Sequence, residues 1–320
     1  MNFSVQILGS NSASFAYGRH HTSQVVNHND NLYLVDCGEG TQIRMAKFKI
    51  RHSRINHIFI SHLHGDHYLG LMGLLSTMHL QGRKHDLHVF GPSGLEDIIT
   101  LQLKLSDSVL NYQIHFHAIM PEQEGVIFED PQLEVEAICM EHRVPCHGFI
   151  FREKPKKRRL MRNKIEGEVS GELIFMLKQG QDVVTQDGRI IESSLVTEDP
   201  GAQRTYVYCA DTRYTETHLS KFKEADLLYH EATFLSDMAE RAGETYHSTA
   251  ADAATLASKA QVKNLMIGHF SSRYKTLELF LAEARQHFPK TVLALEGETF
   301  QIGSVSPALV VEHVSQDVSH

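Results

Sequence analysis

Residues 57–67 read HIFISHLHGDH, and this stretch says more about the fold than any other. The apolar run HIFIS stops at a polar box with a central glycine, which is typical of a buried strand followed by a loop. At the end of a strand, His62 and His64 project to the same side, so both imidazoles can face one metal ion. Asp66 and His67 follow Gly65 across a turn, and we predict that they face a second ion about 3.5–4 Å from the first, as in two-metal hydrolytic sites.

Short strands alternate with helical patterns along most of the chain. Strands are predicted in VQILG (5–9), NLYLVDCGEG (31–40), TYVYCADT (205–212), ADLLYHEATF (225–234), KNLMIGHF (263–270) and TVLALEGETFQI (291–302). Helices are predicted over 66–82, 93–105, 248–260 and 276–288. We expect Ser93 and Glu96 to form a capping box at the start of the second of these helices. Strands that alternate with helices indicate an α/β layered fold.

Three further residues offer metal ligands from distant parts of the chain. His142 follows the strand LEVEAICM, Asp211 follows TYVYCA, and His269 follows KNLMIG. All three come just after a predicted strand, and open α/β sheets gather their ligands at that edge. A carboxylate has two oxygens, so Asp211 can bridge two cations.

Composition narrows the class of protein. The chain has 320 residues, of which 42% are apolar and 22% charged, which is the globular range. No run approaches the roughly 18 unbroken apolar residues of a membrane span, and the N-terminus lacks a signal-peptide pattern. We therefore expect a cytoplasmic protein with no membrane segment. The four cysteines form no CxxC pair, which argues against a disulfide framework and a thiolate zinc site.

Several motifs in order resemble a known family. The HLHGDH box, His142, the ADT at 210–212 and GHFSSRY at 268–274 resemble the metallo-β-lactamase superfamily. Within it, DCGEGTQ at 36–42, HEATF at 230–234, HST at 247–249 and SRY at 272–274 are similar to the ribonuclease Z family of tRNA 3′-processing endoribonucleases. The resemblance runs from ILGSNSAS to about residue 298 and implies a four-layer αββα fold in a single domain over 1–320.

The resemblance also implies roles for the site residues. One zinc ion would be held by His62, His64 and His142, the other by Asp66, His67 and His269, with Asp211 bridging them. This set of imidazoles and carboxylates suits zinc, although manganese or cobalt could substitute. Asp66 would also accept a proton, and Glu231 with His247 would form a proton relay to the leaving oxygen. The implied activity is removal of the 3′ trailer from precursor tRNA, leaving a 3′-hydroxyl on the tRNA and a 5′-phosphate on the trailer.

A basic segment interrupts this pattern. Residues 152–164 read REKPKKRRLMRNK, with eight basic residues and one acidic residue. We place an insertion at about 151–200 and interpret it as a protruding RNA-binding arm, because cations release condensed counterions when they meet phosphates. The RNA-binding candidates are Lys156, Lys157, Arg158, Arg159 and Arg162. A second basic run, with Lys47, Lys49, Arg51 and Arg54, is expected to line the entry to the site. The resemblance implies a homodimer in which the arm grips tRNA bound to the other subunit.

Two other functions fit parts of the sequence. A phosphodiesterase of the same fold that acts on small phosphodiesters or cyclic nucleotides would share the metal ligands but would not need a basic arm. A binding protein with structural zinc is a different class. Structural zinc sites usually have four protein ligands for each ion, whereas seven ligands shared by two ions leave room for water.

Overall fold

The computed structural model describes residues 2–165, 167 and 169–303, and two seven-stranded sheets form its centre. The first sheet has the strand order β18 (Thr299–Gln301), β1 (Phe3–Gly9), β2 (Ser23–His28), β3 (Asn31–Val35), β4 (Ile55–Phe59), β5 (Leu87–Pro92) and β6 (Ile114–Ile119). The second has the order β17 (Thr291–Leu293), β16 (Leu265–Gly268), β15 (Leu227–Glu231), β14 (Thr205–Cys209), β9 (His147–Glu153), β8 (Leu133–Cys139) and β7 (Gly125–Glu129). Strands β3 to β6 run parallel, and so do β14 to β17.

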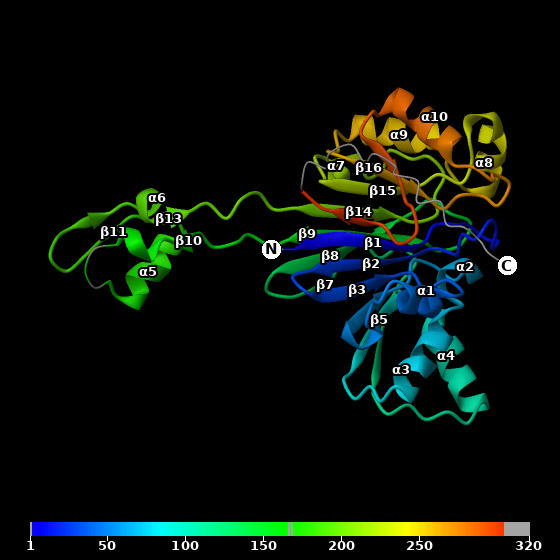
Figure 1. Cartoon of the computed structure of the whole chain (residues 1–320), viewed down its shortest axis with the longest axis horizontal. Coiled ribbons are helices and arrows are strands. Elements are labelled where there is room, and N and C mark those ends of the chain that lie inside the picture. The colour runs from blue at the N-terminus through cyan, green and yellow to red at the C-terminus, as the bar shows by residue number, and fades with distance from the viewer. Residues whose placement is uncertain (1, 166, 168, 304–320) are drawn as a thin grey trace, which may run out of the picture.

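Helices cover the outer side of each sheet. Beside the first sheet lie α1 (Thr41–Lys47), α2 (Gly65–Tyr68), α3 (Leu71–Leu80) and α4 (Gly94–Leu105). Beside the second lie α7 (Leu219–Phe222), α8 (Ala239–Thr245), α9 (Ala250–Lys259) and α10 (Glu278–His287). Figure 1 shows the resulting order of layers, helices then sheet then sheet then helices. The predicted four-layer αββα fold is confirmed. Within the described residues, no helix is long and apolar enough to cross a membrane.

Aromatic side chains join the two sheets. Phe59 of β4 packs against Phe149 and Phe151 of β9, with ring centroids 5.5 and 5.6 Å apart. All three are fully buried, and burying an aromatic side chain of this size stabilises the fold by roughly 1.5–3 kcal/mol. This packing joins the two sheets face to face near the end of β4.

The helix starts differ from the sequence expectation at one point. The helix after β5 is present, but Ser93 already has helical backbone angles (φ −53°, ψ −29°) and its side chain makes no capping hydrogen bond. The capping box predicted at Ser93 is therefore wrong, because a serine inside the helix cannot fold back over its first turn. A capping box does occur at α9, where Thr249 and Asp252 bond each other's backbone N–H groups. It fixes the chain just after His247.

The segment between β9 and β14 protrudes from the body, as Figure 1 shows. It contains β10 (Arg159–Leu160), the 3-10 turn η2 (Arg162–Lys164), α5 (Gly171–Lys178), β11 (Val183–Val184), β12 (Ile190–Ile191), α6 (Ser193–Val196) and β13 (Thr197–Glu198). We call residues 154–203 the arm. It has a small apolar cluster of its own, in which Leu177, Val183 and Val196 are buried.

The root of the arm is held by a buried ion pair. Glu153 is fully buried at the end of β9, and Arg204 donates to its carboxylate from Nε (2.9 Å) and Nη2 (2.7 Å). Lys156 and His28 also contact Glu153, at 2.6 and 3.1 Å. Burial alone would raise the pKa of Glu153, but hydrogen bonds from Arg204 and Lys156 outweigh it and hold that pKa well below its usual range. Both ends of the arm are thus fastened to the body.

Candidate metal centre

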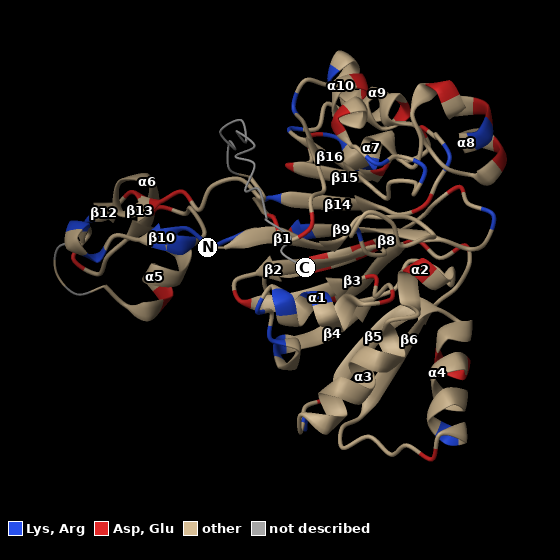
Figure 2. Ribbon diagram, turned by 45° about the vertical axis from the view of Figure 1, so that its right-hand side comes forward, with Lys and Arg blue, Asp and Glu red and all other residues tan. Residues whose placement is uncertain are grey.

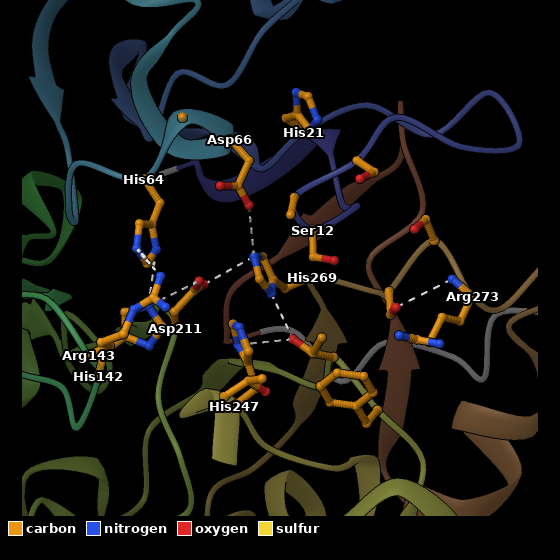
Figure 3. Close-up of a pocket in the computed structure, with 18 of the residues that line it drawn as sticks. Ser12, His21, His64, Asp66, His142, Arg143, Asp211, His247, His269 and Arg273 are labelled. Atoms are coloured by element: carbon orange, nitrogen blue, oxygen red, sulfur yellow. Dashed lines mark hydrogen bonds and ion pairs between the residues drawn. The ribbon is translucent and has the colours of Figure 1, made fainter. Parts of the chain in front are cut away.

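The loops that follow the strands enclose a cavity of about 780 Å³ (Figure 3). The first sheet and its helices contribute His64 and Asp66, and the second contributes His142, Asp211 and His269. Two further residues named by the sequence, His62 and His67, are fully buried behind this surface. The structure therefore brings together all seven metal ligands proposed from the sequence, from four separate segments of the chain.

Three imidazoles form the first cluster. Nδ1 of His64 lies 3.0 Å from Nε2 of His62 and 3.2 Å from Nε2 of His142. Oδ2 of Asp211 lies 3.6 Å from Nε2 of His62 and 3.9 Å from Nε2 of His142. Four ligand atoms thus surround one point. Burial lowers the pKa of both His62 and His142, which favours the neutral imidazole that binds metals.

The second cluster lies on the other side of Asp211. Nε2 of His67 is 3.3 Å from Nε2 of His269, and Oδ2 of Asp66 is 3.5 and 3.4 Å from these two nitrogens. Oδ1 of Asp211 completes the group, 3.3 Å from His67 and 3.1 Å from His269. Asp211 therefore presents one carboxylate oxygen to each cluster.

The spacing of these atoms fits divalent cations. Two ligands that bind one tetrahedral ion at about 2.0–2.1 Å lie about 3.3 Å apart, and most of the distances above are close to that value. Oδ1 of Asp211 is buried and has no hydrogen-bond partner among the described residues, so a bound cation would satisfy this oxygen. These are metal-binding His/Asp clusters. Sγ of Cys146 contacts His62 at Nδ1 (3.5 Å), the nitrogen that faces away from the cluster, and Cys146 belongs to neither cluster.

Hydrogen bonds on the far side of three of the five rings fix which nitrogen points into the clusters. Nδ1 of His67 lies 2.7 Å from Asp36, Nδ1 of His142 lies 3.0 Å from the backbone oxygen of Tyr246, and Nδ1 of His269 lies 2.9 Å from Thr233. When Nδ1 carries the proton and donates it, the lone pair of Nε2 faces the ligands of the cluster. These outer contacts thus orient three of the imidazoles for metal binding.

Asp36 contacts one of the proposed ligands and was not among the residues singled out from the sequence. It lies at the end of β3 with φ 54°, in the left-handed region that is uncommon for a residue other than glycine. Its carboxylate accepts hydrogen bonds from the N–H of Ser61 (2.7 Å) and the hydroxyl of Tyr208 (2.5 Å) as well as from His67. The strand-end aspartate of DCGEGTQ was visible in the sequence. Its partner His67 was not, because that contact depends on the pairing of β3 with β4.

Glu231 and His247 form a second arrangement beside the clusters. Nδ1 of His247 lies 2.8 Å from Oε1 of Glu231. Glu231 is fully buried and also accepts hydrogen bonds from the N–H groups of Thr212 and Thr233 and from the hydroxyl of Thr233. Burial alone would lower the pKa of His247, but the charge of Glu231 and its hydrogen bond outweigh burial and raise that pKa to about 9. His247 also lines the cavity.

The basic candidates of the arm lie away from this cavity, which no described residue of the arm lines. Lys156 contacts Glu153, Arg158 contacts Asp199 at 3.3 Å, and Arg159 contacts Glu198 at 2.6 Å. Nζ of Lys157 lies 4.4 Å from the centre of the Phe175 ring, and Arg162 is in η2. Most of these cations therefore already have partners within the arm or at its root.

The second basic run does not lie where we expected it. Lys49, Arg51 and Arg54 line a separate cavity of about 340 Å³, next to β1, β2 and β18, and not the metal cavity. The reason is the direction of β4: Arg54 precedes this strand, whereas His62 follows it, so the two lie toward opposite ends of the strand.

Fold and clusters together define a metallo-β-lactamase-fold metalloprotein. Among solved structures, the short form of human tRNase Z matches with a TM-score of 0.68 and 27% identity over 93% of this chain and 98% of that one. The metallo-β-lactamase-fold protein YhfI from Bacillus subtilis, at TM-score 0.66 and 19% identity over 94% of this chain and all of that one, supports the fold alone.

Curated relatives identify the family. Ribonuclease Z of Cytophaga hutchinsonii is 45% identical over 305 residues, covering 94% of this chain and 97% of that protein. Ribonuclease Z of Bacteroides fragilis is 43% identical over 295 residues, covering 92% and 97%. The chain belongs to the ribonuclease Z family. A family model described as anti-Pycsar protein Apyc1 also matches residues 3–161, slightly less than half of the chain.

Proposed function

We propose that this protein is a metal-dependent endoribonuclease that removes the 3′ trailer from precursor tRNA. The products would be a tRNA with a 3′-hydroxyl and a trailer with a 5′-phosphate. The observation that carries the proposal is Asp211, with one oxygen in each of two ligand clusters, in a chain of the ribonuclease Z family. Hydrolysis of a phosphodiester requires a nucleophilic water, compensation of charge at the phosphate and a proton for the leaving oxygen.

We assign two zinc ions to each subunit. His62, His64 and His142 would hold one, Asp66, His67 and His269 would hold the other, and Asp211 would contact both. Manganese and cobalt suit the same nitrogen and oxygen ligands. When bound, a pair of divalent ions supplies charge compensation at the phosphate and lowers the pKa of water toward about 7.

The remaining steps fall to side chains. Asp66 lies on the wall of the cavity and would accept the proton of the attacking water. His247 would donate a proton to the leaving oxygen, and Glu231 would hold its ring at Nδ1 so that Nε2 carries the proton toward the substrate. Two cations on the cavity wall, Arg143 and Arg273, are placed to contact phosphates of the RNA.

We further propose that residues 1–320 form one domain with the arm as an RNA-binding insertion of about 151–200. Lys156, Lys157, Arg158, Arg159 and Arg162 would contact phosphates. A substrate that contacts both the arm and the metal cavity would have to be larger than a small diester, because the arm protrudes from the body (Figure 1) and none of its described residues lines the cavity. In a homodimer, the arm of one subunit would hold tRNA whose 3′ end lies in the partner's cavity. The cytoplasm, where tRNA is processed, is the location that we assign.

One experiment tests the function against its rival. The purified protein is incubated with a precursor tRNA and, separately, with a cyclic nucleotide and a small phosphodiester, with and without a chelator. We expect one cut at the 3′ end of the tRNA body, abolished by the chelator and restored by zinc. Cleavage of the cyclic nucleotide without cleavage of the precursor would instead identify a small-molecule phosphodiesterase. Activity that survives complete metal removal would contradict the assignment of the metal clusters.

A further inference from the structure

The loop between β1 and β2 forms one wall of the metal cavity and carries two exposed aromatic rings. Ser12, Ala13 and Ser14 line the cavity. The chain then continues into a tip where the side chains of Phe15 and Tyr17 are 60% and 56% exposed. Figure 1 shows this dark-blue loop at the same end of the molecule as α2, which contains two of the metal ligands. Two large apolar rings in solvent at the mouth of a polar cavity call for an explanation, because exposed aromatic side chains gain no burial energy there.

The tip has a defined conformation. The N–H of Arg19 donates to the backbone oxygen of Ala16 at 2.9 Å, which closes a tight turn. Both central residues are left-handed, Tyr17 with φ 55° and Gly18 with φ 74°, as in a type I′ turn. Asparagine, aspartate and glycine are favoured at such positions, whereas tyrosine is not. A bulky ring in an unfavourable backbone conformation indicates a position kept for its side chain.

The rings are also fastened to the body. The guanidinium of Arg19 donates to Asn11 (2.9 Å) and to the backbone oxygens of Tyr274 (2.5 Å) and Lys275 (3.0 Å). Its Cζ lies 5.2 Å from the centre of the Tyr17 ring. Phe15 packs edge-on against His20, with centroids 5.0 Å apart. One side of each ring is thus supported while more than half of its surface stays open. The platform is ordered before a ligand arrives.

We propose that Phe15 and Tyr17 form a stacking platform for the unpaired nucleotides that flank the scissile phosphate of the RNA. This inference rests on the proposed endoribonuclease function and adds to it the residues that receive the bases. Aromatic faces stack on any base, so such a platform holds single-stranded RNA with little sequence preference. The position of the platform indicates which nucleotides it would bind. Ser14 lines the cavity that would hold the scissile phosphate, and Phe15, the first ring, is the next residue in the chain.

The test removes the aromatic faces and keeps the loop. Phe15→Leu keeps apolar volume without a π face, and Tyr17→Asn suits the left-handed turn. In the double variant, we expect KM for precursor tRNA to rise roughly 10- to 100-fold, the loss of one stacked base. The value of kcat and the hydrolysis of methyl p-nitrophenyl phosphate should stay unchanged, because the platform binds bases and touches no reacting atom. Phe15→Trp, which keeps an aromatic face, should retain the wild-type KM.

Leu101→Ala serves as the matched control, because Leu101 is also an apolar residue with an exposed side chain (55%) but lies on α4. A direct readout uses a precursor with 2-aminopurine just after the cleavage site, bound to the slow variant His247→Ala. Stacking on the platform should quench the fluorescence, and adding Phe15→Leu and Tyr17→Asn should restore it.

Three outcomes would overturn the inference. An unchanged KM and unchanged quenching in the double variant would show that no base stacks there. An equal loss on precursor tRNA and on the small diester would show that the loop only shapes the cavity. A wild-type protein that hydrolyses the small diester but never the precursor would refute the proposed function itself, and with it the platform.

Discussion

The charged side chains of the metal centre and those of the arm differ in burial and in pairing. At the metal centre, ionisable groups are buried and have fixed partners, as His67 has in Asp36. On the arm, cations lie at the surface and pair with neighbouring acids; the side chain of Arg159, which pairs with Glu198, is 78% exposed. Exposed pairs stabilise a protein by only about 0–1 kcal/mol. Arm cations can therefore exchange their partners for phosphates, whereas the ligands of the metal centre cannot move without loss of the site.

The charge of the arm depends on how much of it is counted. Residues 154–164 carry +7, but residues 165–203 contain two basic and eight acidic residues, so the whole arm, 154–203, carries only +1. Figure 2 shows the two colours of charge side by side on the arm. The arm thus carries nearly balanced charge, and the RNA binding that we propose for it would require ion pairs such as Arg159–Glu198 to open. Substitutions at the metal centre and on the arm test whether the two regions differ in this way.

The largest effect is expected for His64→Ala at the metal centre. His64 supplies the ligand atom nearest to both His62 and His142, so we expect hydrolysis of every substrate to be abolished and metal content to fall, with the fold retained. Metal content, activity and thermal unfolding are measured on the same preparation. His115→Ala is the control, since His115 pairs with Asp86 on the first sheet and should leave all three unchanged. Full activity at unchanged metal content would exclude His64 as a ligand.

His247→Ala is expected to slow cleavage of precursor tRNA by roughly 100- to 10,000-fold, the range for loss of a general acid. Metal content should hardly change, because Glu231 holds His247 from outside the two ligand clusters. Loss of metal in this variant would identify His247 as a ligand. The test is needed because His247 lies close enough to Asp211 and His269 to share a metal ion with them.

The pH profile separates a proton donor from a structural histidine. The pKa of His247 is raised to about 9, so the acid form is present below that pH and is lost as pH rises through it. Bound divalent cations oppose the shift by their charge, so kcat/KM should fall on the alkaline side at a pH of about 9 or somewhat below. The variant His247→Ala should lack this limb. If kcat/KM fell at the same alkaline pH in the wild type and in the variant, the titrating group would be a residue other than His247.

Asp36→Asn tests the support beneath the metal centre. An amide has the shape of the carboxylate but brings an NH₂ group to a place where Ser61, His67 and Tyr208 all donate. We expect metal affinity to fall by roughly 10- to 100-fold, the usual effect of losing a residue that orients a metal ligand. Asp86→Asn on the surface is the control. If the Asp36→Asn variant competed with a chelator for metal as well as the wild type does, His67 would need no hydrogen-bond partner at Nδ1 to bind metal.

The two regions also differ in how far the sequence predicts them. The seven proposed metal ligands could be picked out because each follows a strand, and strand ends meet at one edge of the fold. Thr233 could not, because a lone hydroxyl carries no signal until folding places it 2.9 Å from His269. On the arm, the sequence shows the basic residues but not their pairing with Glu198 and Asp199, which depends on β10 lying beside β13.

The arm variant should have the smallest effect on the chemistry. We change Lys157, Arg159 and Arg162 to serine and keep Lys156, since its loss would take a partner from buried Glu153. Binding of precursor tRNA should weaken, and the slope of log affinity against log salt should fall by about 0.7–0.9 for each phosphate that the variant no longer neutralises. Hydrolysis of a small diester should be unchanged, because the described residues of the arm do not line the metal cavity.

The control removes the same charge from the body by changing Lys84, Lys104 and Lys290, all exposed, to serine. If RNA responds only to net charge, both variants will weaken binding equally, and the arm has no special role. If the arm binds phosphates, only the arm variant flattens the salt dependence. An unchanged salt dependence in both would mean that the arm cations keep their acidic partners when RNA is present. If the arm variant lost activity equally on precursor tRNA and on the small diester, the arm would support the metal cavity. The arm and the metal centre would then not be independent regions.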